Sequence, residues 1–93
     1  MNIKYIYSIH SLERMEDRNI SKLEVDSILN NTVGRLIAKS KHDKNALLYM
    51  GFVDQRGLVI IVNPNKLTVI TVRRMRKKEE AFFKKKQEEE QNE

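Results

Sequence analysis

Three apolar runs separated by short polar turns most constrain what this 93-residue chain can fold into. The runs cover residues 46–53, 58–62 and 67–73, and the turns cover 54–57 and 63–66. Connections this short favour antiparallel strands, because a parallel crossover needs about a dozen residues or more. The pattern predicts an antiparallel meander, and the alternation within 33–41 adds a fourth strand ahead of it.

Two helices are predicted before the strands. The spacing of Ile9, Leu12 and Met15 indicates a helix over 9–17 with these three residues on its buried face. The segment from Ser21 to Glu24 has the pattern of a capping box, so a second helix is expected from Ser21 to about residue 30. Residues 1–7 alternate imperfectly and are predicted to be an extended lead-in outside the four-stranded sheet.

Residues 75–93 are predicted to form a charged C-terminal helical tail outside the domain of residues 1–74. Phe82 or Phe83 would dock the first turns of this helix, and the remainder would run into solvent. Residues 73–86 carry eight basic and two acidic groups, within a chain of formal net charge +5. Such a block indicates either a polyanion-binding patch or a solvated helix face.

Several kinds of chemistry are excluded by what the sequence lacks. The absence of cysteine removes disulfides, cysteine-based zinc sites and thiol catalysis. The three glycines are isolated, so no glycine-rich phosphate loop is present, and no acidic cluster suggests a metal site. We therefore expect no cofactor and no metal. No signal peptide or membrane-spanning run is visible, so a cytoplasmic location is expected.

Two sets of residues are candidates for phosphodiester chemistry. His10, Arg14 and Arg18 share one helix face, which helical geometry places about 160° from the expected apolar stripe. An imidazole can move a proton and a guanidinium can hold a phosphate in a bidentate manner. Thr71 and Arg73 share a face of the last strand with Val69. Ordinary solvated surface residues remain the alternative interpretation.

Further basic residues are candidates for binding nucleic acid without taking part in chemistry. Three of them alternate along one face of the 33–41 strand, and four lie in the basic block. They are Arg35, Lys39, Lys41, Arg74, Arg76, Lys77 and Lys78.

The segment from Ser8 to Ser21 resembles the opening motif of a family of small bacterial and phage proteins distantly related to RelE-type toxins. The motif consists of Ser or Thr, one residue, His, then Arg-Met, a second Arg, and Ile-Ser at the start of the next helix. The matching residues here are Ser8, His10, Arg14, Met15, Arg18, Ile20 and Ser21. The Ile-Thr-Val strand of the family is matched by 70–72, so the resemblance covers roughly residues 5–74.

This resemblance implies an α+β fold of the RelE or barnase type, with two N-terminal helices packed on a four-stranded antiparallel sheet. It also implies a toxin-like, metal-independent endoribonuclease that uses the ribose 2′-OH and leaves a 2′,3′-cyclic phosphate. His10 would transfer the proton, Arg14 and Arg18 would bind the phosphate, and Thr71 and Arg73 would flank it.

The expected partners are RNA and a small antitoxin, with no membrane involved. The sequence leaves the oligomeric state open, with a homodimer as one option. Many RelE-type toxins have a lysine- and arginine-dense helix core and a tyrosine near the last strand. Neither is present here, which favours free RNA over RNA on the ribosome. The alternative function is a non-catalytic accessory module of phage or plasmid origin that binds nucleic acid or protein.

Overall fold

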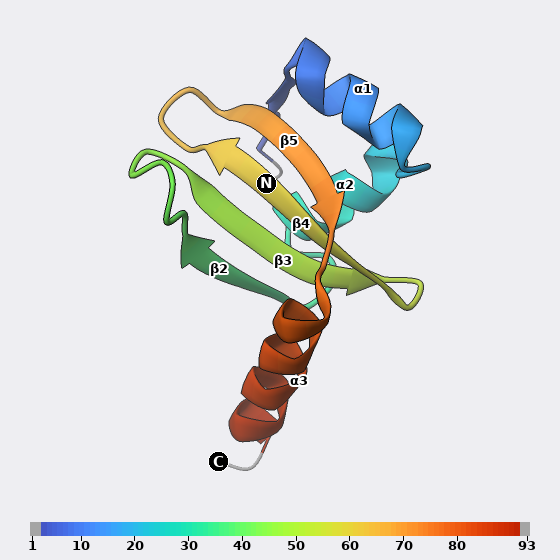
Figure 1. The fold of residues 1–93 in the computed structure, drawn as a ribbon, viewed down its shortest axis with the longest axis vertical. Helices are drawn as coiled ribbons and strands as arrows, with labels where there is room; N and C mark the ends of the chain where they lie inside the picture. Colours follow the sequence, from blue (N-terminus) through green and yellow to red (C-terminus); the bar gives the residue numbers. More distant parts are fainter. Residues whose placement is uncertain (1–2, 92–93) are drawn as a thin grey trace.

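A computed structural model describes residues 3–91, which form three helices and one five-stranded sheet (Figure 1). The fold is α+β, as the sequence predicted. No helix in this range is both long enough and apolar enough to cross a membrane. In chain order the elements are β1 (Ile6–Tyr7), α1 (Ile9–Asp17), α2 (Lys22–Leu29), β2 (Arg35–Lys39), β3 (Leu47–Val53), β4 (Arg56–Asn63), β5 (Thr68–Arg74) and α3 (Lys77–Gln91).

The sheet has the strand order β1-β5-β4-β3-β2. Strands β2 to β5 form the predicted antiparallel meander. The prediction of a four-stranded, wholly antiparallel sheet is wrong, because β1 adds a fifth strand parallel to β5. Tyr7 anchors β1 through tertiary contacts: its hydroxyl donates to Asp26 of α2, and the Lys22 ammonium lies 5.0 Å from its ring centroid. A strand of two residues is too short to show the apolar–polar alternation from which strands are predicted, so the sequence carries no clear sign of β1.

Helices α1 and α2 pack on one face of the sheet, and α2 is built as predicted. Ser21 caps α2, and both hydrogen bonds of the capping box with Glu24 are present. Burying the apolar stripe of α2 against β4 forms the main core. The residues concerned are Val25, Ile28 and Leu29 of α2 with Leu58, Ile60 and Val62 of β4.

The predicted buried face of α1 is wrong for two of its three residues. Ile9 is 77% exposed and Leu12 is 47% exposed, whereas Met15 is buried. The helix instead turns Ser11 inward, where the side chain is fully buried and its hydroxyl donates to the Ser8 carbonyl at 2.7 Å. A small residue at this position lets α1 lie close to β5, and that close packing outweighs the burial of two larger side chains.

Helix α3 packs on the opposite face of the sheet and projects beyond its edge (Figure 1). Phe83 docks it: the side chain is 1% exposed, packs with Val59 and Met75, and lies 5.3 Å from the Phe52 ring, centroid to centroid. Phe82 remains 48% exposed. This face therefore has its own small apolar cluster, separate from the main core on the other side.

Candidate nucleic-acid interface

The His10, Arg14 and Arg18 stripe lies closer to the sheet than the sequence suggested. With Ser11 and Met15 facing inward, helical geometry places the centre of the stripe about 80° from the buried direction. Its three members have different environments. His10 is exposed, Arg14 pairs with Asp17 at 3.5 Å on the surface, and Arg18 reaches the sheet.

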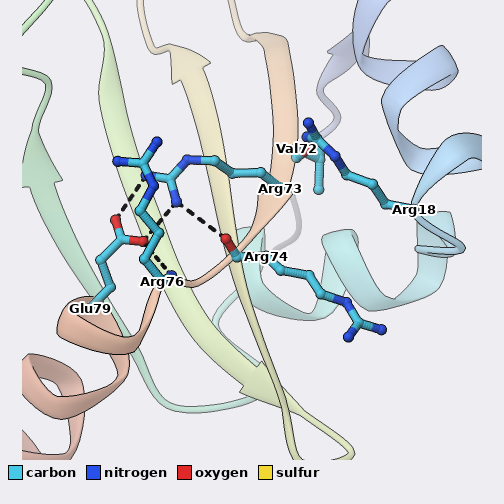
Figure 2. Close-up of polar contacts among 6 residues, drawn as sticks. All are labelled: Arg18, Val72, Arg73, Arg74, Arg76 and Glu79. Carbon is cyan, nitrogen blue, oxygen red and sulfur yellow. Dashed lines mark hydrogen bonds and ion pairs between the residues drawn. The ribbon is translucent and has the colours of Figure 1, made fainter.

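Arg18 covers an open edge of the sheet. Because β1 pairs with β5 only at Thr68 and Val69, the rest of that β5 edge has no neighbouring strand among residues 3–91. The Arg18 guanidinium donates to the Val72 carbonyl at 2.5 Å, and the Ser8 hydroxyl donates to the Ile70 carbonyl at 3.0 Å. Figure 2 shows the Arg18 side chain reaching Val72 from the end of α1. Both side chains thus satisfy backbone acceptors that another strand would otherwise pair with, which gives Arg18 a structural role.

A β-bulge in β5 separates the predicted catalytic residues. The register shifts beside Ile61, so that Ile61 pairs with Thr71 while the next residue of β4 pairs with Val69. Val69 and Val72 consequently both face α1 and α2, whereas Thr71 and Arg73 face the α3 side. A single inserted residue reverses the face of everything after it. The prediction that Thr71 and Arg73 share a face with Val69 is wrong, and His10 and Arg14 lie across the sheet from them.

On the α3 side, Arg73 forms a bidentate pair with Glu79 of α3, at 2.7 and 2.8 Å (Figure 2). The Glu79 carboxylate also accepts from the Arg76 backbone N–H at 2.8 Å. The hydrogen bonds from Arg73 hold the pKa of Glu79 below its usual range, and those same bonds raise the pKa of Arg73. The two side chains are only 20% and 23% exposed, so this pair ties α3 to β5 in a partly desolvated setting.

A basic cleft of about 640 Å³ opens beside this pair, between β2, β5, the β2–β3 connection and α3. Five Lys or Arg side chains and one histidine contribute to its lining, namely Lys39, Lys41, His42, Arg73, Arg76 and Lys78. Its apolar residues are Ala38, Leu48, Met50, Ile61 and Phe82. Among the described residues that line the cleft, Glu79 is the one carboxylate. The cleft therefore combines an excess of positive charge with an apolar floor.

The predicted nucleic-acid-binding residues divide between this cleft and other places. Lys39, Lys41, Arg76 and Lys78 line it, together with Arg73 from the predicted catalytic set. Arg35, Arg74 and Lys77 do not contribute to its lining.

Two of the residues outside the cleft, Arg35 and Arg74, lie on the helix-covered face. The Arg35 guanidinium donates to the Ile28 carbonyl at the end of α2 and lies 5.0 Å from the Tyr49 ring centroid. The backbone hydrogen bond from Ser21 holds the pKa of Glu24 below its usual range, and Arg74 contributes a smaller charge effect. Arg35 thus has a structural role on that face, whereas the Arg74 side chain is exposed there.

Three cleft residues were missed by the sequence reasoning. His42 lies in a connection among lysines, Glu79 was counted only as part of the tail charge, and Phe82 was considered only as a docking residue. The signal that could have identified His42 and Phe82 is their position within basic segments, Lys39 to Lys44 and Lys77 to Lys86. The proximity of these segments is a tertiary property.

The fold and site thus define a small α+β domain with a basic, apolar-floored cleft on the less covered face of its sheet. Within residues 3–91, no group of three His, Asp or Glu side chains could hold a metal ion. No protein-family model, curated protein or solved structure matches the chain. The likeness to the RelE-related family therefore remains a prediction from the sequence motif.

Proposed function

We propose that this protein binds RNA in the basic cleft, in keeping with the non-catalytic alternative drawn from the sequence. The observation that carries this proposal is the gathering of five Lys or Arg side chains from two distant segments, residues 39–41 and 73–78, around one cleft of about 640 Å³. Lysine and arginine side chains neutralise backbone phosphates and dominate nucleic-acid affinity. An RNA ligand also fits the predicted cytoplasmic location.

Two matched double variants test the proposal. Lys41→Ala with Lys78→Ala removes two charges that line the cleft, whereas Lys44→Ala with Lys77→Ala removes two exposed charges from the same loop and helix outside it. Binding of a labelled RNA oligonucleotide would be measured by fluorescence anisotropy across a salt series. We expect the cleft variant to bind at least about fivefold more weakly, with a salt slope about 1.4 shallower if two phosphate contacts are lost.

The control variant should change the affinity less than about twofold, because neither side chain lines the cleft and neither is expected to pair with a phosphate held there. Equal losses in the two variants would show that only net charge matters and would contradict binding in the cleft.

A second candidate function, the toxin-like endoribonuclease, is favoured by His42. This imidazole lines the cleft among cations, so a proton-transfer group and phosphate-binding groups share one site. His42 replaces His10 in this candidate, because Thr71 and Arg73 lie on the face opposite α1. The same proposal includes a RelE- or barnase-like fold, an antitoxin partner and a homodimer.

This candidate is tested by incubating RNA with the protein in EDTA and analysing the ends for a 2′,3′-cyclic phosphate. We expect His42→Ala to slow cleavage by about 10²-fold or more, the usual contribution of a positioned acid or base. His10→Ala, the matched control on α1, should leave the rate unchanged. If the wild-type protein binds RNA without cleaving it, the binding function stands alone. Loss of cleavage in His10→Ala only would return the chemistry to α1.

A further inference from the structure

We infer that the cleft holds an unpaired RNA base, stacked on Phe82 above the apolar floor. This inference rests on the proposed RNA-binding function and adds to it the structural class of the ligand, a single strand. Three features carry it: the exposure of Phe82, the apolar floor, and the position of the cations around them.

Phe82 is exposed, and it is not needed to dock α3 on the sheet. Its neighbour Phe83 supplies the buried contact at 1% exposure, whereas Phe82 is 48% exposed and lines the cleft. Lys78 also lines the cleft from one helical turn earlier, and the Lys86 ammonium lies 5.7 Å from the Phe82 ring centroid. An exposed ring between cations resembles the stacking platforms of proteins that bind single strands, where aromatic faces take bases and cations take phosphates.

The floor of the cleft suits a base more than a phosphate. Ala38, Leu48, Met50 and Ile61 line it with aliphatic groups, and Met50 is 5% exposed. A base presents flat apolar faces that can lie on such a surface, whereas a phosphate placed there would lose its hydration. The five cations lie among the same lining residues, so a nucleotide can place its phosphate on them and its base on the floor.

The requirement for base access discriminates between RNA forms. In a duplex the faces of the bases are stacked on one another and are not available to a side chain, and double-stranded RNA is recognised mostly through its backbone and shape. Charge alone would allow a duplex to bind at the rim. Contact with Phe82 and the floor requires a base that is free of its stack, so the cleft should prefer a single strand.

The experiment measures anisotropy of a labelled single-stranded oligonucleotide, and of the same strand in a duplex, with three proteins. These are the wild type, Phe82→Ala, and Phe82→Tyr, which keeps an aromatic ring. For the single strand we expect Phe82→Ala to bind about fivefold more weakly or worse, and Phe82→Tyr to bind like the wild type. Duplex affinity should be the same in all three. Circular dichroism melting would verify that the variants are folded.

The possible outcomes distinguish a failure of this inference from a failure of the proposed RNA-binding function. If the wild type binds neither RNA form, the proposed function fails, and the inference fails with it. If Lys41→Ala with Lys78→Ala weakens RNA binding while Phe82→Ala does not, the cleft binds backbone only and the base inference alone is overturned.

Two competitors complete the test. If polyglutamate displaces the labelled strand as effectively as unlabelled RNA does, the cleft recognises negative charge alone. If uridine monophosphate displaces the labelled strand at low concentration, the cleft is a site for a free nucleotide. Either result would overturn the inference.

Discussion

Replacing Phe83 with alanine is expected to lower the free energy of unfolding by about 3 kcal/mol, the lower end for a buried Phe→Ala change. Phe83 is 1% exposed and packs against Phe52, Val59 and Met75, so its removal leaves a cavity between α3 and the sheet. The effect stays near the lower end because α3 can detach while the main core under α1 and α2 persists. Urea unfolding followed by circular dichroism would measure it.

The adjacent residue provides a matched control for this prediction. Phe82→Ala removes the same side chain from the same helix at a position that is 48% exposed, so it should cost less than about 1 kcal/mol. Phe83→Ala should also weaken RNA binding, because a detached α3 withdraws Arg76, Lys78 and Phe82 from the cleft. Equal stability losses in the two variants would mean that α3 is docked differently from the arrangement in Figure 1.

Replacing Glu79 with glutamine is expected to strengthen RNA binding about tenfold. The Glu79 carboxylate occupies the Arg73 guanidinium through two hydrogen bonds, in the bidentate manner that a phosphate would use. Hydrogen bonds to charged groups contribute about 1.5–3 kcal/mol, so releasing Arg73 to the ligand and removing the opposing charge both favour binding. Glutamine can still accept from the Arg76 backbone N–H, which preserves the start of α3.

Glu80→Gln is the control for that change, because it removes the same charge from the next residue of α3, which is not part of the cleft lining. Its effect on RNA affinity should be less than about twofold. Anisotropy titrations at one salt concentration compare the two variants with the wild type. A similar gain in both would attribute the effect to net charge, and a loss in Glu79→Gln would show that Glu79 positions Arg73 for binding.

The same substitution has a pH signature in stability. Because the pKa of Glu79 is lower in the folded protein than in the unfolded chain, its ionised form stabilises the fold above the unfolded value of about 4.3. That contribution disappears as the pH falls from about 5 through the folded pKa. The stability advantage of the wild type over Glu79→Gln should therefore shrink as the pH falls below about 5 in urea unfolding. A constant difference over this range would contradict the ion pair with Arg73.

Local signals in the sequence determined a large part of this fold. The capping box at Ser21 fixes the start of α2, because its two hydrogen bonds involve residues three apart. The short turns after β3 and β4 fix the antiparallel meander, and Asn19 ends α1 with a positive φ of 54°. The sequence also predicted that a phenylalanine would dock a C-terminal helix. The capping box, the turns and the end of α1 each depend on residues close together in the chain.

Long-range packing decided the rest, including the site. Pairing of β1 with β5 joins segments about sixty residues apart, and the bulge after Val69 sends Thr71 and Arg73 to the α3 side. The close approach of α1 to β5 selected Ser11 for its buried face, and the docking of Phe83 left Phe82 exposed. The cleft forms only where these choices bring the end of β2, the end of β5 and the start of α3 together. Sequence spacing does not encode such contacts, because their free energy comes from surfaces that meet only in the folded chain.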